Sequence, residues 1–173
     1  MLLTMLQLRD LPSNEILEKF AERYPVADVS AISSFLHLLR VATDLSLALD
    51  ACLMEHGLLQ GRWWVLILLM REDSKISSPS VLAEKAGVSR ATMTGLLDGL
   101  VRDGLVERVF DEHDRRSVSI SLTDKGQAKL DDVMPDYYAR LRACMAEVDE
   151  KSRVQLERTL ELINHGLIKF SKK

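Results

Sequence analysis

Two short stretches of the sequence carry side chains suited to phosphates and base edges. The first, residues 89–94, combines small hydroxyls with one guanidinium group: Ser89, Arg90, Thr92 and Thr94. The second, residues 111–116, sets two arginines beside two aspartates: Asp111, Asp114, Arg115 and Arg116. Hydroxyls donate to phosphate oxygens or base edges, and a guanidinium group binds either. A neighbouring carboxylate can hold a guanidinium group in one orientation. These residue types favour contacts with nucleic acid.

No catalytic or metal-binding pattern accompanies them. The sequence holds no Ser/His/Asp set, no glycine-rich phosphate loop and no paired acids in an evident cleft. His37 and His56 lie 19 positions apart in one predicted helix, His165 lies in another, and His113 lies in a predicted turn. This is not the spacing of metal ligands. We therefore expect no enzymatic activity, no metal ion and no cofactor.

The two cysteines, Cys52 and Cys144, lie in separate helical stretches and form no CxxC pair. A disulfide or a zinc site is not expected, and a reducing, cytoplasmic compartment is the simpler interpretation. Cys52 raises the alternative of a redox sensor. It lies between Leu49 and Leu53 with no adjoining basic residue to favour the thiolate, so we expect a buried, inert thiol.

Residues 80–104 predict the two short helices that would position the first stretch. Ala83 is small enough for close helix crossing, Gly87 can take a positive φ in the turn, and Ser89 can cap the second helix. A shared core is expected from Leu82, Ala86, Met93, Leu96, Leu97 and Leu100. This pattern indicates a helix-turn-helix, whose second helix enters the major groove with its N-terminal end. The candidate DNA contacts here are Ser80, Ser89, Arg90, Ala91, Thr92 and Thr94.

A β-hairpin is predicted directly after these helices. Residues 105–110 read as one strand, and residues 117–122 alternate with Val118, Ile120 and Leu122 facing inward. The turn between them would present Arg115 and Arg116 to a narrow minor groove, with Asp111 and Asp114 as orienting groups. Arg108, on the first strand, is a further candidate contact.

Further helices are predicted on both sides of this centre. They cover residues 13–24, 29–56, 62–71, 124–147 (with a bend at Pro135) and a last helix capped by Asp149. The helix at 62–71 is apolar nearly all round, so it belongs in the core. The last helix carries a narrow heptad-like seam, which favours a partner helix and a two-fold dimer. The candidate interface residues are Ile32, Leu36, Leu156, Leu160, Ile163, Leu167 and Phe170.

The composition and charge of the chain indicate what class of protein it is. The chain has 173 residues, with 47% hydrophobic and 28% charged residues, which is typical of a folded globular protein. Its net charge is −3, and residues 75–125 hold eight basic and eight acidic residues. A DNA-binding face in this segment must therefore arise from basic residues gathered on one side, because the segment has no net positive charge. No apolar run is expected to span a bilayer, and residues 1–8 lack the pattern of a signal peptide.

The order of these motifs resembles that of the multiple-antibiotic-resistance regulator (MarR) family of bacterial winged-helix proteins. The resemblance covers most of residues 30–170 and rests on three groups: Leu82-Ala83-Glu84 with Gly87-Val88-Ser89-Arg90-Ala91-Thr92; Leu97, Leu100 and Gly104-Leu105-Val106-Glu107-Arg108; and Asp111, Asp114-Arg115-Arg116 and Leu122-Thr123-Asp124-Lys125-Gly126. It implies a mainly α fold with a small β-hairpin wing, an obligate homodimer, a pseudo-palindromic operator in double-stranded DNA, and a small-molecule or redox inducer. Two departures are Gly95, where many relatives carry a larger residue, and Val109-Phe110 before the wing.

The expected organisation has three parts. Residues 1–28 form an N-terminal extension, residues 57–123 the winged helix-turn-helix, and residues 29–56 with 124–171 the dimerisation helices. The expected function is that of a sequence-specific transcriptional regulator, a repressor released by a small ligand. The alternatives are an architectural or protein-interaction winged helix without a specific operator, and a cysteine-based redox regulator. Arg40, Trp63 and Trp64 are candidates for binding the effector.

Overall fold

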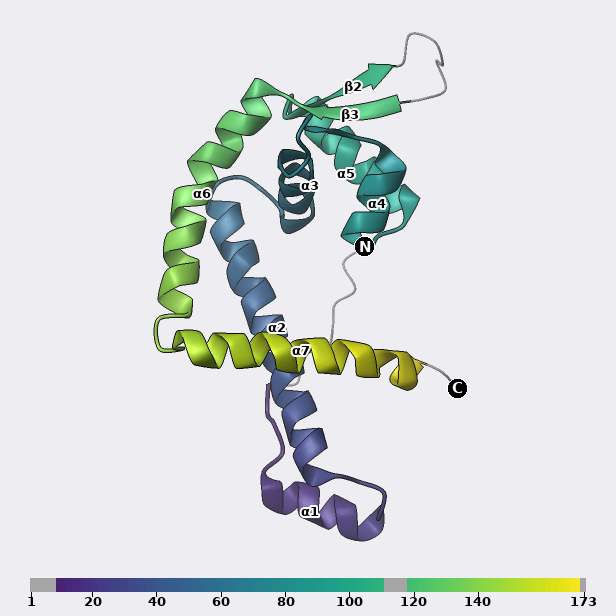
Figure 1. Ribbon diagram of the computed structural model, residues 1–173, viewed down its shortest axis with the longest axis vertical. Helices are drawn as coiled ribbons and strands as arrows, with labels where there is room; N and C mark the ends of the chain where they lie inside the picture. Colours follow the sequence, from purple (N-terminus) through teal and green to yellow (C-terminus); the bar gives the residue numbers. More distant parts are fainter. Residues whose placement is uncertain (1–8, 111–117, 172–173) are drawn as a thin grey trace. The chain divides into compact units, whose positions relative to one another are not determined.

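The computed structural model describes residues 9–110 and 118–171. The chain divides into two compact units, one ending at Gly126 and one beginning at Gln127. The helices and strands of the described residues are α1 Asn14–Arg23, α2 Val29–Glu55, α3 Gln60–Met70, β1 Ile76–Ser77, α4 Pro79–Ala86, α5 Arg90–Arg102, β2 Val106–Phe110, β3 Val118–Leu122, α6 Asp124–Cys144 and α7 Glu150–Ser171 (Figure 1). This mainly helical fold with a small antiparallel sheet confirms the predicted fold class.

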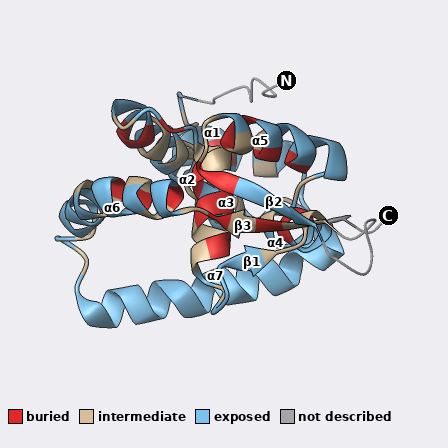
Figure 2. Ribbon diagram, turned by 90° about the horizontal axis from the view of Figure 1, so that it is seen from above, coloured by how far each residue is buried: buried red, intermediate tan, exposed pale blue. Residues whose placement is uncertain are grey.

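The core of the first unit surrounds α3, which packs against α4, α5 and β3 and carries buried residues along much of its length (Figure 2). Trp63, Val65, Leu66 and Leu69 are buried in this helix, as a helix that is apolar nearly all round requires. Its partners in the core include Leu82, Met93, Leu97, Leu100, Val106 and Ile120. The predicted place of this helix at the centre of the core is confirmed.

The sheet has three strands in the order β1-β3-β2, all antiparallel. In the hairpin, Val106 pairs with Leu122 and Phe110 with Val118. Ile120 and Leu122 are buried and Val118 is partly buried, which confirms the predicted inward alternation. Strand β1 was not predicted. It is only two residues long and follows Lys75, which has a φ of 54°.

Helix α2 is long and strongly apolar, yet only Cys52 and Leu53, near its C-terminal end, are buried. Its 27 residues include a stretch whose mean hydropathy of 1.3 meets the length and composition of a membrane-spanning helix. The expectation that no apolar run reaches that length is therefore wrong for this helix, because its charged residues are few and widely spaced. Length and composition alone are weak evidence for a membrane span, since a helix covered by other protein has the same properties.

The N-terminal extension is folded where it is described. Ser13 caps α1, as predicted, because its hydroxyl accepts a hydrogen bond from the backbone of Ile16. Leu17 is the buried residue of α1, and this helix packs on α2. The extension thus belongs to the first unit.

In the second unit, α7 begins as the sequence predicts. The Asp149 carboxylate accepts a 2.7 Å hydrogen bond from the backbone N–H of Ser152, and this bond lowers the pKa of Asp149. Helix α6 continues through Pro135 and ends at Cys144, three residues before the predicted end. The α7 residues of this unit are exposed (Figure 2).

Candidate nucleic-acid interface

The turn between α4 and α5 has the geometry that the sequence predicts for a helix-turn-helix. Gly87 takes a φ of 64° at the C-terminal cap of α4, a left-handed conformation that favours glycine. The Val88 N–H donates to the Ala83 carbonyl at 3.0 Å, and Ser89 caps α5 by accepting from the Thr92 N–H at 3.1 Å. These local bonds fix where α5 starts.

The first two turns of α5 separate a buried face from an exposed one. Met93 is buried in the core, whereas Arg90, Ala91, Thr92 and Thr94 are exposed. The exposed side chains lie around the N-terminal end of a 13-residue helix, where unpaired N–H groups and the helix dipole favour anions. This arrangement brings four of the predicted DNA contacts together on one surface.

The hydroxyls of this surface already make local hydrogen bonds. Thr92 Oγ1 lies 2.9 Å from Ser89 Oγ, and Thr94 donates to the Arg90 carbonyl at 2.9 Å. Ser80, exposed on α4, lies 3.0 Å from Ser78 Oγ, the cap of that helix. Their oxygen lone pairs can still accept hydrogen bonds, so these contacts orient the hydroxyls without excluding a role in binding.

Two ion pairs tie α5 to its neighbours. Arg108 of β2 donates to Asp98 at 2.5 Å, and Arg62 of α3 donates to Asp103 at 2.7 Å. The predicted DNA contact Arg108 is therefore engaged with the recognition helix in the free protein. The sequence analysis did not find either pair, since ten and 41 residues separate the partners.

The C-terminal end of α5 is held by the start of α6. Lys125 donates to the Asp103 carbonyl at 2.7 Å, and Thr123 donates to the Gly104 carbonyl at 2.8 Å. The Thr123 hydroxyl also accepts from the Gly126 N–H at 3.0 Å, so it caps α6. These bonds satisfy carbonyls that a helix end leaves unpaired. They give the segment 123–126, singled out in the sequence, a structural role.

The wing is present as the hairpin of β2 and β3. The residues predicted at its tip lie outside the described residues: Asp111, Asp114, Arg115 and Arg116. Their roles in orienting and contacting DNA stay predictions. The strands that carry them confirm the predicted element.

The candidate interface residues on α7 are exposed in this chain by itself. They form one seam of five apolar side chains, with 39% to 80% of each exposed: Leu156, Leu160, Ile163, Leu167 and Phe170. On α2, Ile32 and Leu36 are partly buried. Several further large apolar side chains of α2 are exposed: Phe35, Leu39, Val41, Leu45 and Leu47.

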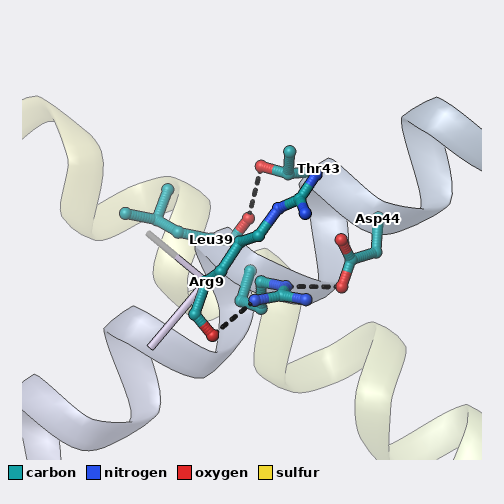
Figure 3. A network of polar contacts seen from close by, with 5 residues as sticks. Arg9, Leu39, Thr43 and Asp44 are labelled. Atoms are coloured by element: carbon teal, nitrogen blue, oxygen red, sulfur yellow. Dashed lines mark hydrogen bonds and ion pairs between the residues drawn. The ribbon is translucent and has the colours of Figure 1, made fainter. Parts of the chain in front are cut away.

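The three effector candidates have different surroundings. Trp63 is core, whereas 42% of Trp64 is exposed on the same helix. Arg40 donates to Asp44 at 2.6 Å and to the backbone carbonyl of Arg9 at 2.8 Å (Figure 3). Arg40 thus connects the N-terminal extension to α2 in the free protein.

The two cysteines differ in exposure. Cys52 is buried, as predicted, and Cys144 is exposed. Among the described residues, no group of three or more His, Cys, Asp or Glu side chains could hold a metal ion.

Comparison with known proteins decides the family. The model of the MarR family matches residues 56–117. The HTH-type transcriptional repressor YetL of Bacillus subtilis is 32% identical over 148 residues, which cover 86% of this chain and 89% of YetL. The chain belongs to the MarR family. It is a DNA-binding transcriptional regulator, and the predicted resemblance is confirmed.

Solved structures of the family share the fold. The MarR family regulator Sco3205 of Streptomyces coelicolor, solved in complex with DNA, matches with a TM-score of 0.75 at 21% identity, over 82% of this chain and 89% of that chain. CouR of Rhodococcus jostii RHA1, solved with bound p-coumaroyl-CoA, matches with a TM-score of 0.65 at 26% identity, over 74% and 89%.

Proposed function

We propose that this MarR family protein is a repressor that binds a pseudo-palindromic operator as a homodimer and leaves it when a small ligand binds. The exposed N-terminal end of α5, with Arg90, Ala91, Thr92 and Thr94 on one surface, carries this proposal. In a helix-turn-helix this end reads base edges in the major groove. Ser80 and the wing arginines would add contacts to the DNA backbone and minor groove.

The apolar surfaces of α2 and α7 support the homodimer. Large apolar side chains are exposed along both helices, and a large exposed apolar patch marks a surface that other protein covers. We assign residues 29–56 and 124–171 to dimerisation and residues 57–123 to DNA binding. A second copy would cover the seam of α7. If it also covers α2, the apolar composition of that helix is that of a dimer interface.

Release by a ligand rests on the family. CouR was solved with p-coumaroyl-CoA, so at least one relative accommodates an organic acyl thioester. In this chain, the half-exposed Trp64 offers an aromatic surface and Arg40 a cation. The regulator would act without catalysis, in the cytoplasm of a bacterial cell, where it meets the chromosome.

Selection from random DNA duplexes tests the proposal. Two recognition helices in a two-fold dimer should meet successive major grooves about 34–36 Å apart, so the selected sites should be inverted repeats with half-sites about one turn apart. The specific complex should also bind much more tightly than a scrambled duplex. Recovery of sequences without dyad symmetry would contradict the operator and favour an architectural winged helix.

A further inference from the structure

Arg62 reaches from the first turn of α3 to the far end of the recognition helix. Its Nη1 donates to Asp103 Oδ2 at 2.7 Å, and only 21% of the Arg62 side chain is exposed. Asp103 is the C-terminal cap of α5, so this contact lies at the opposite end of the helix from Arg90. The pair therefore joins the core helix α3 to the C-terminal end of α5.

The guanidinium group of Arg62 also lies directly on the backbone of α5. A Cβ atom at Gly99 would be 2.3 Å from Arg62 Nη2 and 2.8 Å from Cζ, so a larger residue there would force the guanidinium group to move. The preceding residue, Gly61, packs against Leu96, where a Cβ atom would be 3.0 Å from Cδ2. Each helix thus contributes a glycine to the crossing of α3 and α5, and Arg62 spans it.

The ion pair between Arg62 and Asp103 is expected to add little to the stability of the fold. A partly exposed ion pair contributes at most about 1 kcal/mol to folding. Nine residues separate Gly99 from Arg90, a length of about 13 Å along a helix. A rotation of about 10° at the crossing would therefore move the N-terminal end of α5 by about 2 Å, which is enough to break hydrogen bonds to bases.

We propose that Arg62 is a positioning residue that sets the angle of the recognition helix, and thereby the specificity for the operator, without touching DNA. The proposal rests on the function proposed above, in which α5 reads the operator. If the two recognition helices of a dimer are misaligned, they cannot fit both half-sites of one operator. They can still bind the DNA backbone non-specifically, because that attraction depends on charge and not on register.

The first experiment compares Arg62→Met with Arg102→Met. Both variants lose one positive charge beside Asp103, but Arg102 is mostly exposed and lies 3.6 Å from that carboxylate. Affinity for operator and scrambled duplex is measured by fluorescence anisotropy over a salt series. We expect Arg62→Met to bind the operator about tenfold more weakly, with unchanged binding of scrambled DNA and an unchanged salt slope, whereas Arg102→Met behaves as wild type.

The salt series separates positioning from direct contact. If Arg62→Met weakens both duplexes and lowers the salt slope by about one, Arg62 binds a phosphate and the proposal is wrong. Equal affinities of Arg62→Met and wild type for the operator would overturn it as well. If wild type itself does not distinguish operator from scrambled DNA, the proposed function fails first, and the two failures are therefore distinguishable.

A second variant perturbs the contact without removing the arginine. Gly99→Ala should displace the Arg62 guanidinium group, while the higher helix propensity of alanine offsets the lost ion pair. We expect weaker operator binding with a thermal midpoint no lower than that of wild type. The double variant Arg62→Met/Gly99→Ala should lose no more affinity for the operator than the single variant with the larger loss. The reason is that the two substitutions remove the same interaction. Additive losses would show independent effects and overturn the proposal.

Discussion

The hydroxyl groups at the start of the recognition helix have unequal capacities for DNA. The Ser89 oxygen is used in capping α5, and the Thr94 proton is donated to the Arg90 carbonyl. Thr94 can therefore act only as an acceptor unless this bond breaks. Thr92 pairs with a hydroxyl that can reverse its direction, so Thr92 can either donate to or accept from a base.

We predict that Thr92→Ala and Arg116→Ala weaken binding in different ways. Arg116→Ala should weaken operator and scrambled DNA alike and lower the salt slope of log affinity by about one. Thr92→Ala removes no charge, so the slope should stay nearly unchanged while discrimination at one base pair falls by about 1–3 kcal/mol. Binding over a salt series measures both effects. Unaltered affinity and slope of Arg116→Ala would mean that the wing does not touch DNA.

Sequence reasoning located the exposed residues of α5 because caps and turn glycines are local signals. It did not locate the partners of Asp98 and Asp103, which lie on β2 and α3. Both acids form ion pairs that hold α5. Such pairs leave no periodic signal, since they arise only when the elements pack.

At the level of elements, the start of α6 is bound closely to the residues that follow α5. A Cβ atom at Gly126 would lie 2.1 Å from the Leu105 carbonyl oxygen and 2.7 Å from Leu122 Cδ1. The backbone oxygen cannot move away as a flexible side chain can. The close approach of two backbones therefore requires glycine at this position.

We predict that Gly126→Ala destabilises the protein by about 3 kcal/mol, because the added methyl group overlaps a fixed backbone atom. The matched control is Gly95→Ala in α5, where nothing lies within 4 Å of the added Cβ atom. This control should stabilise the helix by about 0.5–1 kcal/mol. Urea unfolding at one protein concentration measures both. Similar stabilities of the two variants would contradict the steric argument.

The elements themselves were largely predictable. Amphipathic periods, capping residues and strand alternation predicted all of the helices in the described residues and both wing strands. Strand β1 could not be predicted, because its two residues pair with β3, more than 40 positions away. A strand this short also has no alternation of apolar and polar residues to detect. The positive φ of Lys75 was equally invisible, since lysine does not favour it.

On the scale of the whole molecule, a single chain leaves the apolar surface of α7 exposed to solvent. Leu160 and Ile163 lie on the seam, whereas Leu162, 71% exposed, lies on another face of the helix. The amphipathic pattern predicted this surface. It could not show which residues a second copy covers, because an interface depends on the shape of both partners.

We predict that Leu160→Asp or Ile163→Asp raises the dissociation constant of the dimer at least about a hundredfold, since an unpaired carboxylate would be buried. Leu162→Asp should leave the dimer intact. Sedimentation equilibrium at micromolar concentration measures the change. A monomeric wild type would refute the dimer, and equal effects of all three variants would show that the seam is wrongly assigned.

The exposed apolar length of α2 has a thermodynamic consequence for the living cell. If that surface is covered only in the dimer, folding and association are one equilibrium, and mass action governs it. Each tenfold rise in concentration should then add about 1.4 kcal/mol to the stability of the assembled state. A regulator present in few copies would be proteolytically vulnerable when newly made.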